Sequence, residues 1–91
     1  MTSRSSRQQT LAAAGAAIDG DRHDDYGAVA DNWRRIAAMW TAILGVDVTP
    51  EQTGLCMIAV KLSRLVNTPD HHDSWVDVAG YAALGAEVSG G

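Results

Sequence analysis

Helical periodicity restricts the fold of this sequence more than any other feature. From about residue 28 to residue 44, large apolar residues recur at spacings of three and four, which places them on one face of an α-helix. A second stripe of the same kind runs from about residue 50 to residue 67. The expected stripes are Val29, Trp33, Ile36, Ala37, Trp40, Ile43 and Leu44, and then Leu55, Ile58, Ala59, Leu62, Leu65 and Val66. No segment reads as a strand, so the pattern predicts an all-α protein.

Residues typical of helix ends mark the limits of both helices. Gly45 stands where the first helix is expected to end in a left-handed cap. Thr49 is a good N-cap, Pro50 suits the first helical position, and Gln52 completes a capping box with the threonine. The second helix is expected to end at the Asn-Thr-Pro sequence of residues 67–69.

Two segments rich in alanine are expected to form the outer helices, at about residues 7–18 and 74–87. Asp73 is expected to cap the later one. Glycines 80 and 85 each cost that helix about 1 kcal/mol relative to alanine, and such small residues often mark a close neighbouring helix or subunit. Its expected core face is Trp75, Val78, Ala79, Ala82 and Ala86.

These elements predict a compact four-helix bundle with the helices at about residues 28–44 and 50–67 at its centre. The bundle is expected to span residues 10–88 and to follow a flexible tail at residues 1–9. A chain of 91 residues buries only about 60% of its unfolded surface, and its core is rich in alanine. Self-association into a dimer or a higher oligomer is therefore expected.

Composition excludes several classes of function. A net charge of −4 and a pI near 5.0 argue against a protein that binds duplex nucleic acid. A single cysteine, Cys56, excludes an intramolecular disulfide framework and a zinc site built from cysteines, and we expect it, like the three tryptophans, to pack in the core. No apolar run is long enough to cross a membrane or to serve as a signal peptide, so a cytoplasmic protein is expected.

The last two helices carry polar residues at helical spacings. Counted from Asp70, Arg64 and Asp77 lie at nearly the same distance from the turn, so we expect them to form an ion pair between antiparallel neighbours. The pair is either purely structural or part of a cationic site for phosphate or carboxylate groups. The residues of this candidate site are Lys61, Arg64, Asp73, Asp77 and Tyr81, and Asp73 and Asp77 are the expected ligands if magnesium is bound.

A second candidate site is the polar loop at residues 20–27. One interpretation is a solvated turn in which an aspartate caps the next helix. The other is a ligand-binding loop, because loops held by rigid helices often carry binding residues. In that case Tyr26 is expected to stack on a base or ring with Arg22 beside it. The candidate residues are Arg22, His23, Asp25 and Tyr26.

These residues resemble a small domain family common in phage and prophage genomes. The resemblance covers about residues 10–88. It rests on five strings, namely Asp19-Gly-Asp-Arg-His-Asp-Asp-Tyr-Gly27, Asn32 with Arg35-Ile-Ala37, Val48-Thr-Pro-Glu51, Lys61-Leu-Ser-Arg-Leu65 and Asp73-Ser-Trp-Val-Asp-Val-Ala-Gly-Tyr-Ala82.

More distantly, the pairing of Lys-x-x-Arg with a later Asp-x-x-x-Asp-x-x-x-Tyr helix is similar to the nucleotide-modification-associated domains of phages. It is also faintly similar to the all-α nucleoside triphosphate pyrophosphatases of the MazG type, which are oligomers that hold magnesium with Glu-x-x-Glu and Glu-x-x-Asp. Asp77 matches the last of those acids, whereas Ser74 stands in place of a glutamate and Lys61 and Arg64 replace the other two. The resemblance therefore implies a MazG-like fold and favours nucleotide binding over hydrolysis.

The leading hypothesis is a protein that binds a small phosphorylated ligand, a nucleotide, and in a phage setting sequesters a host nucleotide or signal. Lys61 and Arg64 contact the phosphate in this hypothesis, while Asp73 and Asp77 orient them or a magnesium ion. The alternatives are a magnesium-dependent nucleoside triphosphate pyrophosphohydrolase and a non-catalytic module that binds a host protein.

Overall fold

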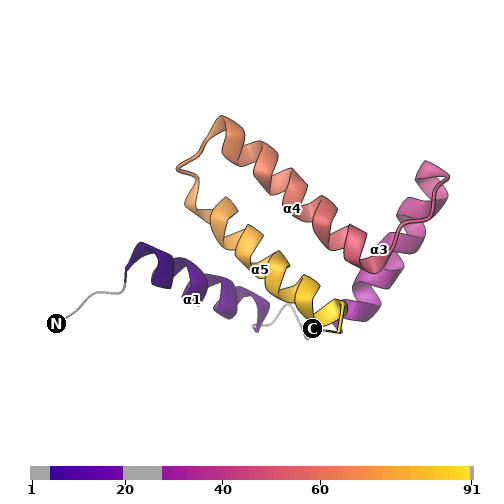
Figure 1. Ribbon diagram of the computed structural model, residues 1–91, viewed down its shortest axis with the longest axis horizontal. Helices are drawn as coiled ribbons and strands as arrows, with labels where there is room; N and C mark the ends of the chain where they lie inside the picture. The colour runs from indigo at the N-terminus through magenta and orange to yellow at the C-terminus, as the bar shows by residue number, and fades with distance from the viewer. Residues whose placement is uncertain (1–4, 20–27, 91) are drawn as a thin grey trace.

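The structure is a computed structural model that describes residues 5–19 and 28–90. Both described ranges are helical apart from short connections, and neither contains a strand, so the all-α class is confirmed (Figure 1). The helices within these two ranges are α1 (Ser6–Ile18), α3 (Val29–Leu44), α4 (Pro50–Asn67) and α5 (His72–Val88).

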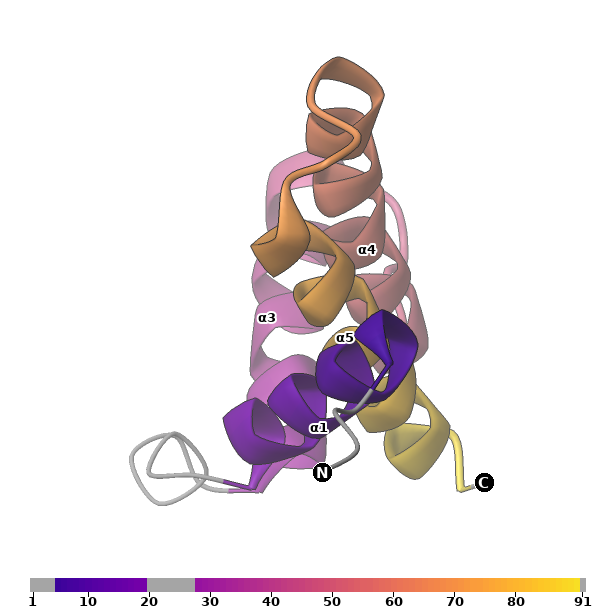
Figure 2. The same ribbon diagram turned by 90° about the vertical axis from the view of Figure 1, so that its left-hand side faces the viewer.

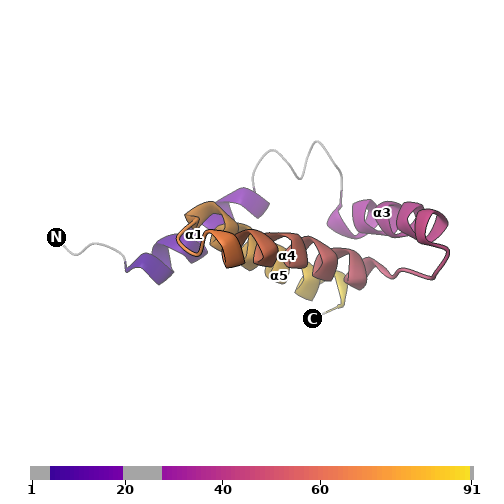
Figure 3. The same cartoon turned by 90° about the horizontal axis from the view of Figure 1, so that it is seen from above.

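The helices are arranged around α5. α4 and α5 form an antiparallel hairpin, and α5 contacts α1, α3 and α4, while α1 contacts no other described helix (Figures 1 and 2). Seen from above, α1 and α3 lie at opposite ends of the hairpin (Figure 3). We expected α3 and α4 to form the centre, and this prediction is wrong because α3 reaches the hairpin mainly through α4. The helices occupy 53 × 31 × 23 Å.

Local capping signals are confirmed at the junction of α3 and α4. Gly45 ends α3 in the left-handed region with φ 74°, and its N–H donates to the carbonyl of Thr41. The Thr49 hydroxyl accepts from the N–H of Gln52 at 3.1 Å, and the Thr49 N–H donates to the Gln52 side chain at 2.9 Å. The N–H of Val48 also donates to Thr41 Oγ1 at 2.8 Å, which ties the connection back to the last turn of α3.

The start of α1 agrees with the prediction to within one residue, whereas that of α5 does not. α1 begins at Ser6, where Ser5 and Gln8 form a second capping box. α5 begins at His72 with His71 at the N-cap position. The predicted cap, Asp73, instead lies exposed in the first helical turn.

The core depends on one aromatic side chain. Trp33 of α3 is 2% exposed, and its ring lies directly on Gly54 of α4. A Cβ atom on Gly54 would lie 2.5 Å from Cη2 of this ring and closer still to Cζ3, whereas one on Gly85 of α5 would lie 3.9 Å away. Trp33 therefore joins three helices. The buried hydrophobic residues are Ala14, Trp33, Ala37, Leu65 and Val76.

The predicted apolar face of α4 is wrong in large part. Leu65 is buried and Ile58 is half-buried, but the other residues of that stripe are exposed. Thr53 and Gly54 are buried in their place, and Lys61 is half-buried on the same side of the helix. The physical reason is that the Trp33 ring needs a residue without a side chain, so Gly54 must face it. The exposed members of the predicted stripe are Leu55, Ala59, Leu62 and Val66.

The other two predicted faces are correct only in part. On α3, Trp33 and Ala37 are buried, but Ile43 and Leu44 are exposed at the end that passes beyond α4. On α5, the buried residues are Ser74, Val76 and Gly80, and a Cβ atom on Gly80 would lie 3.4 Å from the Ile18 side chain of α1. Expected core residues that are exposed on α5 are Trp75, Ala82 and Ala86.

The contact between Trp33 and Gly54 predicts opposite effects for two glycine-to-alanine substitutions. Gly54→Ala is expected to destabilise the fold by about 1–3 kcal/mol, because the new methyl group overlaps the indole. Gly15→Ala, in α1 with no atom within 4 Å, is expected to stabilise it by about 0.5–1 kcal/mol through helix propensity. Urea unfolding at equal protein concentration measures both, and equal gains from the two variants would contradict this packing.

Candidate functional site

An ion pair lies between α4 and α5, the two helices of the hairpin. Lys61 Nζ lies 3.0 Å from Asp77 Oδ2, and the two side chains are 23% and 39% exposed. Asp77 shares its side of α5 with Asp73 and Tyr81, since residues four apart align on a helix. An ion pair thus joins the two helices of the hairpin, as expected, but the cation that forms it is Lys61.

The predicted partner of Asp77, Arg64, does not form this pair. Arg64 is exposed and has no ion pair in the part of the chain that the structure describes. Lys61 and Asp77 lie eight residues on either side of Pro69, whereas Arg64 and Asp77 lie six and seven residues from Asp70. Lys61 also lies on the same side of α4 as the buried Gly54, seven residues earlier, and Arg64 lies about 60° further around the helix.

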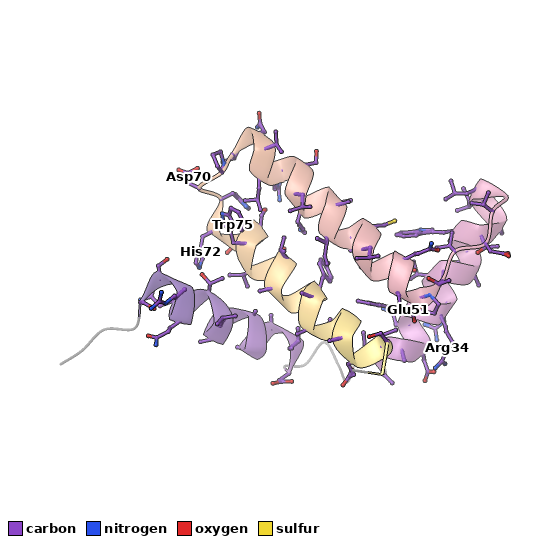
Figure 4. The ribbon with its side chains drawn as sticks, viewed as in Figure 1. Arg34, Glu51, Asp70, His72 and Trp75 are labelled. Carbon is purple, nitrogen blue, oxygen red and sulfur yellow. The ribbon has the colours of Figure 1, made fainter. Side chains whose placement is uncertain are left out.

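Hydrogen bonds order the turn that joins the hairpin. His71 Nδ1 lies 2.8 Å from Ser74 Oγ, and this serine is 1% exposed. The indole N–H of Trp75 donates to the carbonyl of Pro69 at 2.9 Å. Figure 4 shows Asp70, His72 and Trp75 together at this turn, at the opposite end of α4 from Glu51. The contact between His71 and Ser74 was not predicted, although a spacing of three residues at a helix start is a usable signal.

The described residues contain no group of three or more histidine, cysteine, aspartate or glutamate side chains placed to hold a metal ion. Asp73 is exposed one turn before Asp77, and Asp77 contacts Lys61. The other ion pair in the described ranges, between Asp31 and Arg34, lies on the exposed side of α3.

Several other predicted features have definite outcomes. Cys56 is exposed, so its expected place in the core is wrong. Trp33 is buried as expected and Trp40 is half-buried, but about half of Trp75 is exposed. No helix in the described ranges is both long and apolar enough to cross a membrane. The loop candidates Arg22, His23, Asp25 and Tyr26 lie outside the described residues.

The arrangement suits the binding of a small anion. Lys61 presents an ammonium group that is partly shielded from water, and Arg64 carries an exposed guanidinium three residues later. Guanidinium groups bind phosphate through two parallel hydrogen bonds, while ammonium groups act as point charges. Asp77 restrains the lysine through their ion pair.

A double-mutant cycle tests the partner of Asp77. Combining Lys61→Met with Asp77→Asn is expected to show a coupling of roughly 0.5–1 kcal/mol in urea unfolding, as for a half-exposed ion pair, and the coupling should weaken in high salt. The control cycle, Arg64→Met with Asp77→Asn, is expected to show coupling near zero. A larger coupling in the control cycle would indicate that Asp77 pairs with Arg64, as predicted from the sequence, and not with Lys61.

Comparisons with known proteins connect this helical domain to phages. The Gene 55 protein of Mycobacterium phage L5 is 41% identical over 75 residues, which is 81% of this chain and 48% of that protein. The Gene 55 protein of Mycobacterium phage D29 is 34% identical over 65 residues, 71% of this chain and 43% of that protein. The chain thus spans about half the length of these curated relatives. No solved structure matches it.

The expected resemblance to a small phage domain is confirmed by these relatives. A family model described as "Domain of unknown function (DUF6378)" matches residues 9–89, nearly the same span as the resemblance read from the sequence. The chain therefore belongs to the DUF6378 family.

Proposed function

We propose that this domain binds a small phosphorylated ligand, a nucleotide, on the polar side of the α4–α5 hairpin. The observation that carries the proposal is the ion pair between Lys61 and Asp77. It occupies the covered side of α4 while aliphatic residues of the same helix face outward. A partly buried ion pair is often no more stabilising than apolar residues of similar size, so stability alone does not explain its position.

The ligand phosphate contacts Arg64 and Lys61 in this proposal. The exposed guanidinium of Arg64 makes the first contact, and the phosphate then competes with Asp77 for the ammonium group of Lys61. Each binding event therefore releases a carboxylate, which explains why a lysine with an acidic partner suits reversible binding. An acidic protein can hold one anion in this way, because only the local cationic pair matters at such distances.

Two further parts of the proposal come from the sequence. In this proposal, Asp73 and the released Asp77 coordinate a magnesium ion that is bound to the phosphate. This ion needs few protein carboxylates and keeps several waters. The loop with Arg22, His23, Asp25 and Tyr26 closes over the base or sugar. Binding without turnover sequesters the nucleotide in this proposal.

A thermal-shift screen with nucleotides, with and without magnesium, tests this function. We expect a phosphorylated ligand to raise the Tm, because a ligand at 100 times its Kd stabilises the folded state by about 2.7 kcal/mol. Arg64→Ala is expected to weaken the apparent affinity for the ligand at least tenfold. It should leave the Tm of the free protein nearly unchanged, because Arg64 is exposed and forms no ion pair with the described residues.

Arg35→Ala is the matched control, since Arg35 is an exposed arginine on α3, away from the hairpin turn. It should leave the ligand shift intact. The absence of a shift with every nucleotide would overturn the proposal and favour a module that binds a host protein. Release of pyrophosphate in the magnesium samples, lost in Asp77→Ala, would replace binding without turnover by hydrolysis.

A further inference from the structure

α4 carries an exposed row of aliphatic residues that no described helix covers. We call this row the outer seam, and it consists of Leu55, Ala59, Leu62 and Val66. Val66 is 87% exposed, Leu55 is mostly exposed, and about half of Leu62 is exposed. None of the four positions carries an ionisable group. Such a row is unusual for an outer surface and typical of an interface.

The outer seam lies apart from the face that holds the hairpin together. At 100° per residue, its four positions fall within about 60° of one another, and their centre lies on the order of 100° from the line of Gly54, Lys61 and Leu65. The seam spans twelve residues, about 16 Å along the axis. Its spacings of four, three and four match the a and d positions of a heptad, the spacing of helices that pack side by side.

The order of spacings indicates the partner. Four, three and four read the same in both directions, so the seam is complementary to itself when two copies run antiparallel. A two-fold axis between residues 60 and 61 places Leu55 opposite Val66 of the second copy and Ala59 opposite Leu62 of the second copy. A symmetric dimer needs such a self-complementary surface. The small Ala59 beside the axis allows the two helices to approach closely.

The exposed area is sufficient for a dimer. The smaller stable interfaces bury about 600 Å² per partner, of which about 60% is apolar. A fully exposed aliphatic side chain offers on the order of 100 Å². The exposed side chains of the seam offer roughly 200 Å² of this area, and the proposed contact also includes Ile43, Leu44 and Val46, at the end of α3 that leads into α4, for roughly 400 Å² in all. We propose that the outer seam is the contact surface of an antiparallel dimer of this chain.

Two substitutions on α4 test the dimer by light scattering at micromolar concentration. The unmodified chain is expected to have twice its mass of 9.6 kDa. Val66→Lys puts a charge into the seam at both ends of the symmetric contact, so this variant should be monomeric. Val60→Lys is the matched control, because Val60 is 67% exposed on a different side of the same helix, and it should remain dimeric.

Circular dichroism serves as the control that each variant keeps its helix content. A monomeric unmodified chain, as for a seam that binds another protein, would overturn the proposal. A Val66→Lys variant that folds and stays dimeric would overturn it as well.

Cysteine cross-linking tests the register even if a lysine variant fails to fold. Two variants, Ala59→Cys and Leu62→Cys, are each made with Cys56→Ser and then mixed under mild oxidation. Disulfides should link position 59 of one copy to position 62 of the other, because only these two face each other. Each variant alone should cross-link more slowly than the mixture, since its own two cysteines are offset by three residues, about 4.5 Å, along the helix axes. A single variant that cross-links as fast as the mixture, or no cross-link in the mixture, would contradict the antiparallel arrangement.

Discussion

The contact between Trp33 and Gly54 determines how α4 is rotated about its axis. The buried indole of α3 needs a surface with no side chain, and Gly54 provides it. Lys61 lies seven residues further along, almost on the same line of the helix, so it must point into the hairpin. Leu55 and Leu62 then point outward. One contact near the start of the helix thus places both the ion pair and the exposed aliphatic row.

Much of the secondary structure could be predicted from the sequence, because helix ends have local chemical signals. Thr49, Pro50 and Gln52 mark the start of α4, and Gly45 marks the end of α3. The rotation of α4 could not be predicted in the same way. Apolar residues span a wide arc of this helix, wider than its neighbours cover, so periodicity alone selects the row with the most aliphatic side chains. The decisive residue, a glycine, adds nothing to that pattern.

The sequence predicts which helices carry the candidate site, but not which of its residues contact each other. The sequence places Lys61, Arg64 and Asp77 on facing helices, and the structure agrees. Which cation contacts the carboxylate depends on how α4 is rotated about its axis. Lys61 lies on the line of Gly54, which faces Trp33, whereas Arg64 lies about 60° further around the helix. The arginine is thereby left exposed, which makes it more accessible to a ligand than a structural ion pair would have allowed.

The attachment of α1 has a consequence for the dynamics of the chain. Among the described helices, α1 contacts only α5, and Ala14 is its one fully buried residue. Detachment of α1 would therefore leave the Trp33 contact and the hairpin closed. Proteins with such a peripheral element open in stages, so the backbone amides of α1 should exchange with solvent through a cheaper local opening than those around Gly54. Gly80 and Ile18 lie at the contact that such a local opening would break.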